Sequence, residues 1–330
     1  MRPTTPPPCV TDGVGVGESA VPAKGKRCAA FTVLGGAGSD PARSTRGVAW
    51  RATGGHTCRV STSDAGGRQA AESPKAPIAF ERSGEGEPLL LVHANGMSRR
   101  AWTPVLAPLR AERDVVAIDL PGHGESAPIP RHISPAPPGV AYLLVQLLDE
   151  LGIERAHVAG NSLGGWTALE LAKLGRARSV VAFGPAGLWI HGPIRPLIAL
   201  SLTHRAARRW TGLARRAVGT DIGRRVLLRP VVGDPRRVPA ADAVMLTRAL
   251  SEAPGFHPAL VATHMSRFEG GRAIDVPVTV VFGQRDRVVP ASARRRDELP
   301  AHSRWYEPPG LGHVPMWDDP ELIARIILSD

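Results

Sequence analysis

The chain has 330 residues, of which 43% are hydrophobic; this is enough to bury a sizeable core in one or two domains, and no apolar run approaches the roughly 18 residues that a membrane span needs. Its net charge of +11 comes from two segments: residues 1–76 have 10 basic and 5 acidic side chains, and residues 184–275 have 14 basic and 6 acidic ones. The other 162 residues hold 17 basic and 19 acidic side chains. A nucleic-acid groove mixes both kinds of cation with aromatic residues, whereas Arg outnumbers Lys 37 to 4 here, so we expect no nucleic-acid partner.

Residues 1–76 are rich in Pro, Gly, Ser, Thr, Ala and Arg and show no sustained period of 2 or 3.6. Such a composition buries too little apolar surface to offset the entropy of ordering, which predicts a mostly disordered extension. An alternative is a start codon assigned too far upstream, in which case much of the extension is not made.

The three cysteines, Cys9, Cys28 and Cys58, all lie in this extension without metal-ligand spacing. A disulfide framework is therefore not expected, and a cytoplasmic location fits. Residues 24–38 have the outline of a signal peptide, with a basic start and an apolar part diluted by three glycines. Export through this atypical segment is the weaker alternative.

From residue 77 onward, apolar runs alternate with helical patterns in what we take as the second domain, 77–330. Strands are predicted at residues 78–82, 89–92, 115–119, 156–159, 179–183 and 276–282. Helices are predicted to start near Arg99 and to occupy residues 139–151, 166–174 and 320–328. Continuous apolar runs are typical of buried parallel strands, so the alternation predicts an α/β fold with a mostly parallel sheet and helices on both faces.

Residues 187–272 interrupt this alternation with short helical patterns, many arginines and frequent prolines. We expect a helical cap over the carboxyl edge of the sheet, where open α/β sheets bind ligands. Leu197–Leu200 are expected to pack the cap on the core, or alternatively to line an apolar acyl pocket. The arginines recur at helical spacing and favour a solvated face, with an anionic substrate as the alternative; they include Arg208, Arg209, Arg215 and Arg216.

A glycine-flanked serine, Gly160-Asn161-Ser162-Leu163-Gly164-Gly165, stands between the strand at 156–159 and the helix at 166–174. This order is typical of a nucleophile elbow. The sharp turn holds the serine in a strained conformation, and side chains at the flanking positions would collide with neighbouring backbone. Ser162 is therefore the predicted nucleophile.

A serine hydroxyl needs a base, and the base needs an orienting carboxylate. His313 lies on a loop before the final predicted helix, and Asp286 follows the strand at 276–282. The order Ser, Asp, His is the one that α/β-hydrolases use, so we predict a triad of Ser162, Asp286 and His313. The Leu163 backbone N–H is the first predicted oxyanion donor, and the second is expected from the loop at residues 93–96.

The chain resembles the α/β-hydrolase fold family over roughly residues 78–328. The matching pieces are His93–Gly96 with Trp102 downstream, Asp119–Ser126, the elbow, Pro277–Asp286 and Gly312–His313. The resemblance implies that the Asn95 amide is the second oxyanion donor, with Ala94 where the family usually has glycine. It also implies that His93 braces the oxyanion loop and that His123 shapes a loop beside the pocket.

In this family a serine implies acyl transfer, whereas an aspartate at position 162 would suggest a dehalogenase or an epoxide hydrolase. We therefore predict a serine hydrolase for a small-molecule ester or thioester, without a cofactor or metal; the sequence does not indicate an oligomeric state. Asn161 and Trp317 are similar to features of hydrolases that cleave C–C bonds in ring-fission products, which also use a cap arginine. That activity is the first alternative, and a non-catalytic ligand receptor on the same fold is the second.

Overall fold

The computed structural model describes residues 50–51, 57–58 and 78–330, and the chain divides into two units, Met1–Ala71 and Glu72–Asp330. In the first unit, β1 (Trp50–Arg51) pairs with β2 (Thr57–Cys58) in antiparallel orientation. The other expectations for residues 1–76, including those for Cys9 and Cys28, lie outside the described residues.

The second unit is built on a seven-stranded sheet with the order β3-β5-β4-β6-β7-β8-β9. Only β3 runs antiparallel to its neighbour, and the other adjacent pairs are parallel. The strands are β3 (Phe80–Ser83), β4 (Glu87–Val92), β5 (Arg113–Ile118), β6 (Ala156–Asn161), β7 (Ala177–Phe183), β8 (Val278–Val281) and β9 (Arg304–Tyr306).

The central strands are buried on both faces of the sheet. In β4, Leu90 and Val92 pack into one apolar cluster, while Leu89 and Leu91 pack into another on the opposite face. Because successive side chains of a strand point to opposite faces, a strand covered on both sides needs a continuous apolar run. The predicted mostly parallel α/β sheet is thereby confirmed.

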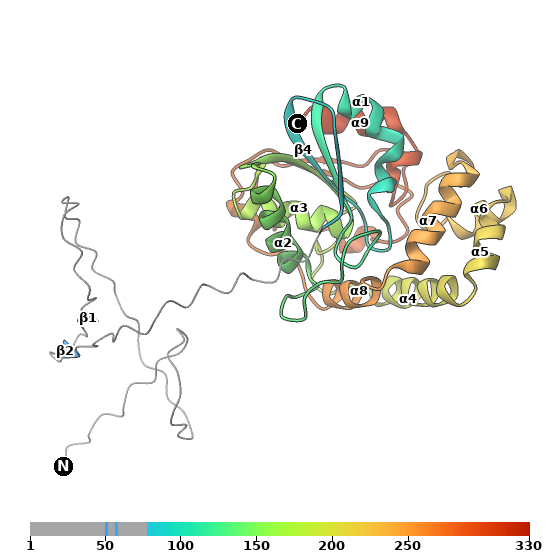
Figure 1. Ribbon diagram of the computed structural model, residues 1–330, viewed down its shortest axis with the longest axis horizontal. Coiled ribbons are helices and arrows are strands. Elements are labelled where there is room, and N and C mark those ends of the chain that lie inside the picture. The colour runs from blue at the N-terminus through green and yellow to red at the C-terminus, as the bar shows by residue number, and fades with distance from the viewer. Residues whose placement is uncertain (1–49, 52–56, 59–77) are drawn as a thin grey trace, which may run out of the picture. The chain divides into compact units, whose positions relative to one another are not determined.

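Helices cover both faces of this sheet (Figure 1). The side chains of α1 (Thr103–Arg110) and α9 (Pro320–Leu328) pack into the cluster that contains Leu89. Those of α2 (Pro137–Glu150) and α3 (Leu163–Lys173) pack into the cluster that contains Leu90. The predicted final helix has the same bounds as α9, where the Asp319 side chain accepts a hydrogen bond from the Leu322 amide and caps the first turn.

Five helices are inserted between β7 and β8. They are α4 (Ile194–Arg209), α5 (Thr211–Val218), α6 (Asp221–Leu227), α7 (Ala240–Glu252) and α8 (Phe256–His264). In Figure 1, α4 and α8 lie side by side, and α5 and α6 lie on the outer side of α7. We call residues 187–272 the inserted segment; its role as a cap stays a prediction.

The strand β9 was not predicted, because it is only three residues long and its Arg304 and Tyr306 are exposed at the sheet edge. Short 3-10 turns complete the unit: η1 (Arg99–Trp102), η2 (Pro235–Arg237), η3 (Gly271–Ala273), η4 (Ala291–Ala293) and η5 (Pro315–Trp317). Across the described part of the chain, every helix is too short or too polar to cross a bilayer.

Candidate active site

Ser162 lies between β6 and α3 in a strained backbone conformation, with φ of 55° and ψ of −111°. Within the described residues it is the only non-glycine residue with positive φ. Its N–H donates to the Phe183 carbonyl at 2.8 Å, and its carbonyl accepts from the amides of Trp166 and Ala186, each at 3.1 Å. These three hydrogen bonds compensate for a conformation that L-residues rarely adopt.

Two glycines of the elbow are required by close backbone contacts. A Cβ atom on Gly160 would lie 2.1 Å from the Gly164 carbonyl oxygen, and one on Gly164 would lie 2.1 Å from the Val92 carbonyl oxygen. Gly165 is less constrained, because its Cβ would meet the nearest atom, Cβ of Pro185, at 3.1 Å. The first two contacts explain why the sequence has glycine on both sides of Ser162.

His313 and Asp286 form a buried pair on the loops that follow β9 and β8. Nδ1 of His313 lies 2.9 Å from Oδ2 of Asp286, and the two residues are 4% and 8% exposed. The other carboxylate oxygen accepts from the amides of Val288 at 2.8 Å and Val289 at 3.0 Å. Burial opposes ionisation of Asp286, but the attraction and hydrogen bond of His313 and the two amides outweigh it and lower the pKa of Asp286.

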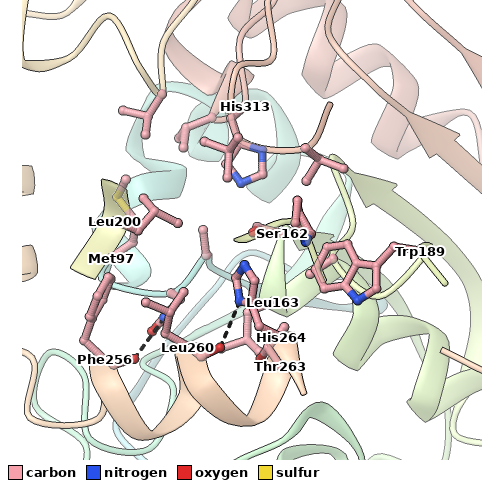
Figure 2. Close-up of a pocket in the computed structure, with 18 residues that line it drawn as sticks. Met97, Ser162, Leu163, Trp189, Leu200, Phe256, Leu260, Thr263, His264 and His313 are labelled. Atoms are coloured by element: carbon pink, nitrogen blue, oxygen red, sulfur yellow. Dashed lines mark hydrogen bonds between the residues drawn. The ribbon is translucent and has the colours of Figure 1, made fainter. Parts of the chain in front are cut away.

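Ser162 and His313 line one pocket at the carboxyl end of the sheet (Figure 2). The structure thus brings the predicted nucleophile and base to a common cavity, with Asp286 behind the imidazole. Because Nδ1 of His313 is engaged by Asp286, Nε2 is the ring nitrogen left for the predicted role of a base.

Both predicted oxyanion residues line the same pocket. The Leu163 amide belongs to the first turn of α3, where N–H groups have no partner within the helix and carry partial positive charge. Asn95 lies in the turn after β4; its Nδ2 donates to the Phe256 carbonyl of α8 at 3.1 Å, and its Oδ1 lies 2.9 Å from Nε2 of His123. Ala94 does not have positive φ, so alanine fits where the resemblance implies glycine.

His93 is hydrogen-bonded to this turn and to the segment that follows β5. It is fully buried; its Nδ1–H donates to the Ala94 carbonyl at 2.7 Å, and its Nε2 accepts from the Leu120 amide at 2.9 Å. Burial lowers the pKa of His93 to about 4, so the neutral ring connects the turn after β4 to the segment after β5. This contact is consistent with the bracing role that the resemblance implies.

Asp318 is a supporting residue that the sequence did not reveal. Its carboxylate accepts from the amide of Gly312 at 2.7 Å and from the amides of Gly233 at 2.9 Å and Asp234 at 2.8 Å. It therefore connects the loop that carries His313 to the inserted segment. No local pattern marks this role, because two of the partners lie 85 and 84 residues earlier in the chain.

Apart from the predicted site residues, the pocket walls are mainly apolar and come from both the sheet loops and the inserted segment. Within the inserted segment, α4 contributes Leu200, and α8 contributes Phe256, Leu260, Thr263 and His264 (Figure 2). Leu200 lines the pocket and also packs against the buried cluster that contains Phe256, so both expectations for residues 197–200 stay predictions. Burial lowers the pKa of His264, whose Nδ1–H donates to the Leu260 carbonyl at 2.9 Å. Among the residues that the structure describes, no group of three His, Cys, Asp or Glu could hold a metal ion.

The sequence model of the alpha/beta hydrolase family matches residues 89–326. An epoxide hydrolase of Mycobacterium tuberculosis is 34% identical over 198 residues, which are 55% of this chain and 88% of that protein. A thermophilic esterase from Thermogutta terrifontis has a similar structure, with a TM-score of 0.56 and 22% identity over 76% of this chain and 92% of that one. A meta-cleavage product hydrolase from Pseudomonas fluorescens IP01 gives a TM-score of 0.60 and 21% identity over 76% and 93%. These two structures share the fold.

Proposed function

The chain belongs to the alpha/beta hydrolase family, and within that family we propose that it is a serine hydrolase that cleaves a carboxylic ester or thioester through an acyl-enzyme. The observation that carries the proposal is the strained Ser162 in a pocket that also contains His313, itself hydrogen-bonded to the buried Asp286. Although one relative is an epoxide hydrolase, the residue at this elbow is serine, which supports acyl transfer.

In the proposed reaction, Oγ of Ser162 attacks the carbonyl carbon while Nε2 of His313 takes the hydroxyl proton. The tetrahedral intermediate then collapses, and the imidazolium gives that proton to the leaving alcohol or thiol. A water molecule attacks the acyl-enzyme as its proton passes to His313, and the imidazolium returns a proton to Ser162 when the acid leaves. Because the pKa of Asp286 is lowered, its carboxylate is charged at neutral pH and stabilises the imidazolium in both halves of the cycle.

The negative charge on the tetrahedral intermediate requires donors on the side opposite His313. We assign this role to the backbone amides of Leu163 and Asn95, which both border the pocket. The positive end of α3 favours the oxyanion at Leu163. The Asn95 side chain is held by Phe256 and His123, which fixes the turn that presents the second amide.

The pocket supports an uncharged, apolar substrate. Among the described residues that line it there is no Arg, Lys, Asp or Glu, so neither an anionic substrate nor the cap arginine of C–C hydrolases finds support there. Apolar side chains from α4 and α8 face the nucleophile, as an acyl-binding wall would. We therefore place the ester reaction before the C–C reaction and assign the inserted segment the role of a cap.

Labelling with a fluorophosphonate probe tests the nucleophile. We expect covalent modification of the wild type, none of Ser162→Ala, and normal labelling of the control Ser201→Ala on α4. A panel of nitrophenyl esters, one dienoate ring-fission product and one aryl epoxide then separates the reactions. Ester hydrolysis together with the label on Ser162 supports the proposal. A protein that is not labelled and opens the epoxide overturns it, and so does a protein that cleaves only the dienoate.

A further inference from the structure

Exposed apolar side chains are concentrated on the outer helices of the inserted segment. Of the fifteen large hydrophobic residues that are exposed in the described part of the chain, eight fall within residues 194–227. Their exposed fractions range from 45% to 75%. The water-exposed surface of a protein does not ordinarily carry so many large apolar side chains in one stretch unless it is an interaction site. They are Ile194, Ile198, Leu202, Trp210, Leu213, Ile222, Val226 and Leu227.

The helix α4 is apolar on two sides. Its inner side carries the buried His204 and Ala207 and the partly buried Leu197 and Leu200, which pack toward the core. A spacing of four places Ile194, Ile198 and Leu202 together on the outer side. Packing among the described residues accounts for the inner stripe only, so within that part of the chain the outer stripe is available to a partner.

Arginines are interleaved with these exposed apolar residues. The stripe of Ile194, Ile198 and Leu202 on α4 continues into Arg205 and Arg209, which are also exposed. Residues 194–229 contain nine arginines and a single acidic residue, Asp221. Asp221 pairs with Arg224, and among the described residues no ion pair is formed by the side chains of the other eight. We call the exposed side chains of α4, α5 and α6 the basic–apolar face.

Charge complementarity decides which partner fits this face. A second copy of the chain would bring the same positive charge to the contact, and residues 1–76 are also basic, with a net charge of +5 from 10 basic and 5 acidic side chains. Nucleic acid would satisfy the arginines but would leave the aliphatic side chains in water. A membrane surface with anionic lipids offers both partners, because phosphates meet the guanidinium groups and the interface accepts the apolar side chains.

We propose that the basic–apolar face binds peripherally to membranes that contain anionic lipids. Because the outer helices carry both signals, an apolar stripe and a cluster of arginines, binding requires no membrane-spanning helix. The face also lies next to the pocket: Pro193, which directly precedes Ile194, lines it, and so does Leu200 on the inner side of α4. Binding through α4 to α6 therefore holds the pocket near the lipid surface.

Vesicle flotation with the full chain tests this proposal. We expect partitioning onto vesicles of equal phosphatidylglycerol and phosphatidylcholine, little onto phosphatidylcholine alone, and weaker binding when NaCl rises from about 50 mM to about 300 mM. The double variant Arg205→Gln/Arg209→Gln should lower the partition coefficient about 25-fold, since each arginine near such a surface contributes about fivefold. Ile198→Ser/Leu202→Ser should lower it at least about tenfold.

Matched controls come from exposed residues outside the inserted segment. Leu174 and Ile198 are each 54% exposed, so Leu174→Ser should leave binding unchanged, as should Arg110→Gln/Arg131→Gln, because both arginines are exposed outside the inserted segment. Circular dichroism shows whether each variant is folded, and Ser162→Ala should bind as the wild type does, so the outcome is separate from the catalytic proposal. Equal binding to both vesicle types, or retained binding in both face variants, overturns the inference. Two other results would also overturn it. In the first, sedimentation velocity shows a dimer that the face variants dissociate while vesicle binding is unchanged. In the second, the protein binds duplex DNA, and the face variants abolish that binding without affecting vesicle binding.

Discussion

The side-chain amide of Asn161 donates a hydrogen bond to the main-chain carbonyl of His313 at 2.8 Å, and a second to the carbonyl of Phe183 at 3.0 Å. Asn161 is fully buried and directly precedes Ser162. The residue next to the proposed nucleophile therefore fixes the backbone of the proposed base, across 152 positions of sequence. This structural contact gives Asn161 a role that does not depend on the C–C reaction.

Replacing Asn161 with leucine should impair catalysis and stability together. The His313 carbonyl would lose its buried donor, and an unsatisfied group of this kind costs about 1–3 kcal/mol. The Phe183 carbonyl would keep the hydrogen bond from the Ser162 N–H. We expect the free energy of unfolding to fall in urea titrations, and kcat for an ester to fall at least about tenfold with KM little changed, because the loop of His313 shifts. Fluorophosphonate labelling of Ser162 should slow in parallel. If the folded variant keeps wild-type kcat, the contact does not position His313.

Asp286→Asn should reduce kcat by about 10³–10⁴-fold, since the imidazole loses both its orienting partner and the charge that stabilises the imidazolium. The stability effect depends on pH. The folded-state pKa of Asp286 is lowered, so its carboxylate contributes stability that is present above about pH 4 and is lost as the pH falls through the folded pKa. Unfolding titrations of both proteins between pH 7 and pH 3 should therefore converge toward low pH. A difference that stays constant would contradict an ionised Asp286 in the folded state.

Elements with a strong local signal could be predicted from the sequence. The run Leu89–Val92 is apolar on both faces because both faces of β4 are covered, and α9 carries its own capping residue in Asp319. By contrast, β9 has no such pattern, because it is short and its Arg304 and Tyr306 are exposed. Its assignment to the sheet depends on pairing with β8, which a local pattern does not record.

The same distinction applies to the site. Glycines at 160 and 164 are imposed by contacts within the turn and with the adjacent strand, so the elbow is visible in six residues. Asp318 has no local signature, because its partners at Gly233 and Asp234 come from the inserted segment. The contact of Asn95 with Phe256 joins residues 161 positions apart. Tertiary contacts of this kind depend on how the inserted segment docks, which no sequence period encodes.

Gly164→Ala should be severely destabilising. Its Cβ would lie 2.1 Å from the Val92 carbonyl oxygen and 2.7 Å from that of His93, and backbone of the central strand can relieve such contacts only by moving. We expect a loss of more than about 3 kcal/mol in urea unfolding, or an insoluble product, since strain in a packed core ordinarily costs about 1–3 kcal/mol or more.

Gly212→Ala is the matched control for this test. Gly212 lies within α5, has no atom within 4 Å of a built Cβ and does not have positive φ. Alanine is the better helix former there by roughly 0.5–1 kcal/mol, so this variant should unfold at higher urea. A Gly164→Ala protein as stable as the wild type would show that the elbow packs differently from the structure.

His93 should make the fold sensitive to mild acid. Burial lowers its pKa from 6.5 to about 4, so between these values the unfolded chain takes up a proton that the folded state does not. The free energy of unfolding therefore falls as the pH drops from 6.5 toward 4, by up to about 1.4 kcal/mol per pH unit for this residue.

His93→Gln should be less stable at pH 7. The slope of its free energy of unfolding against pH should be shallower than that of the wild type by the equivalent of about one proton. The exposed His132→Gln should keep the wild-type slope, and equal slopes in all three proteins would contradict a neutral buried His93.

Leu200→Ala should shift the acyl preference of the proposed esterase toward longer chains. Leu200 lines the pocket from α4, and its truncation opens space opposite Ser162 that additional methylenes can fill. Each methylene newly accommodated contributes about 0.8 kcal/mol, or about fourfold in kcat/KM. The relative kcat/KM for nitrophenyl esters of increasing chain length should therefore rise with length beyond the wild-type optimum.

Leu197→Ala is the control, because Leu197 packs in the same cluster of α4 and α8 but does not line the pocket. This variant should lose comparable stability without any change in chain-length preference. A similar shift in both variants would mean that loosening of α4, and not pocket volume, determines the acyl chain accepted.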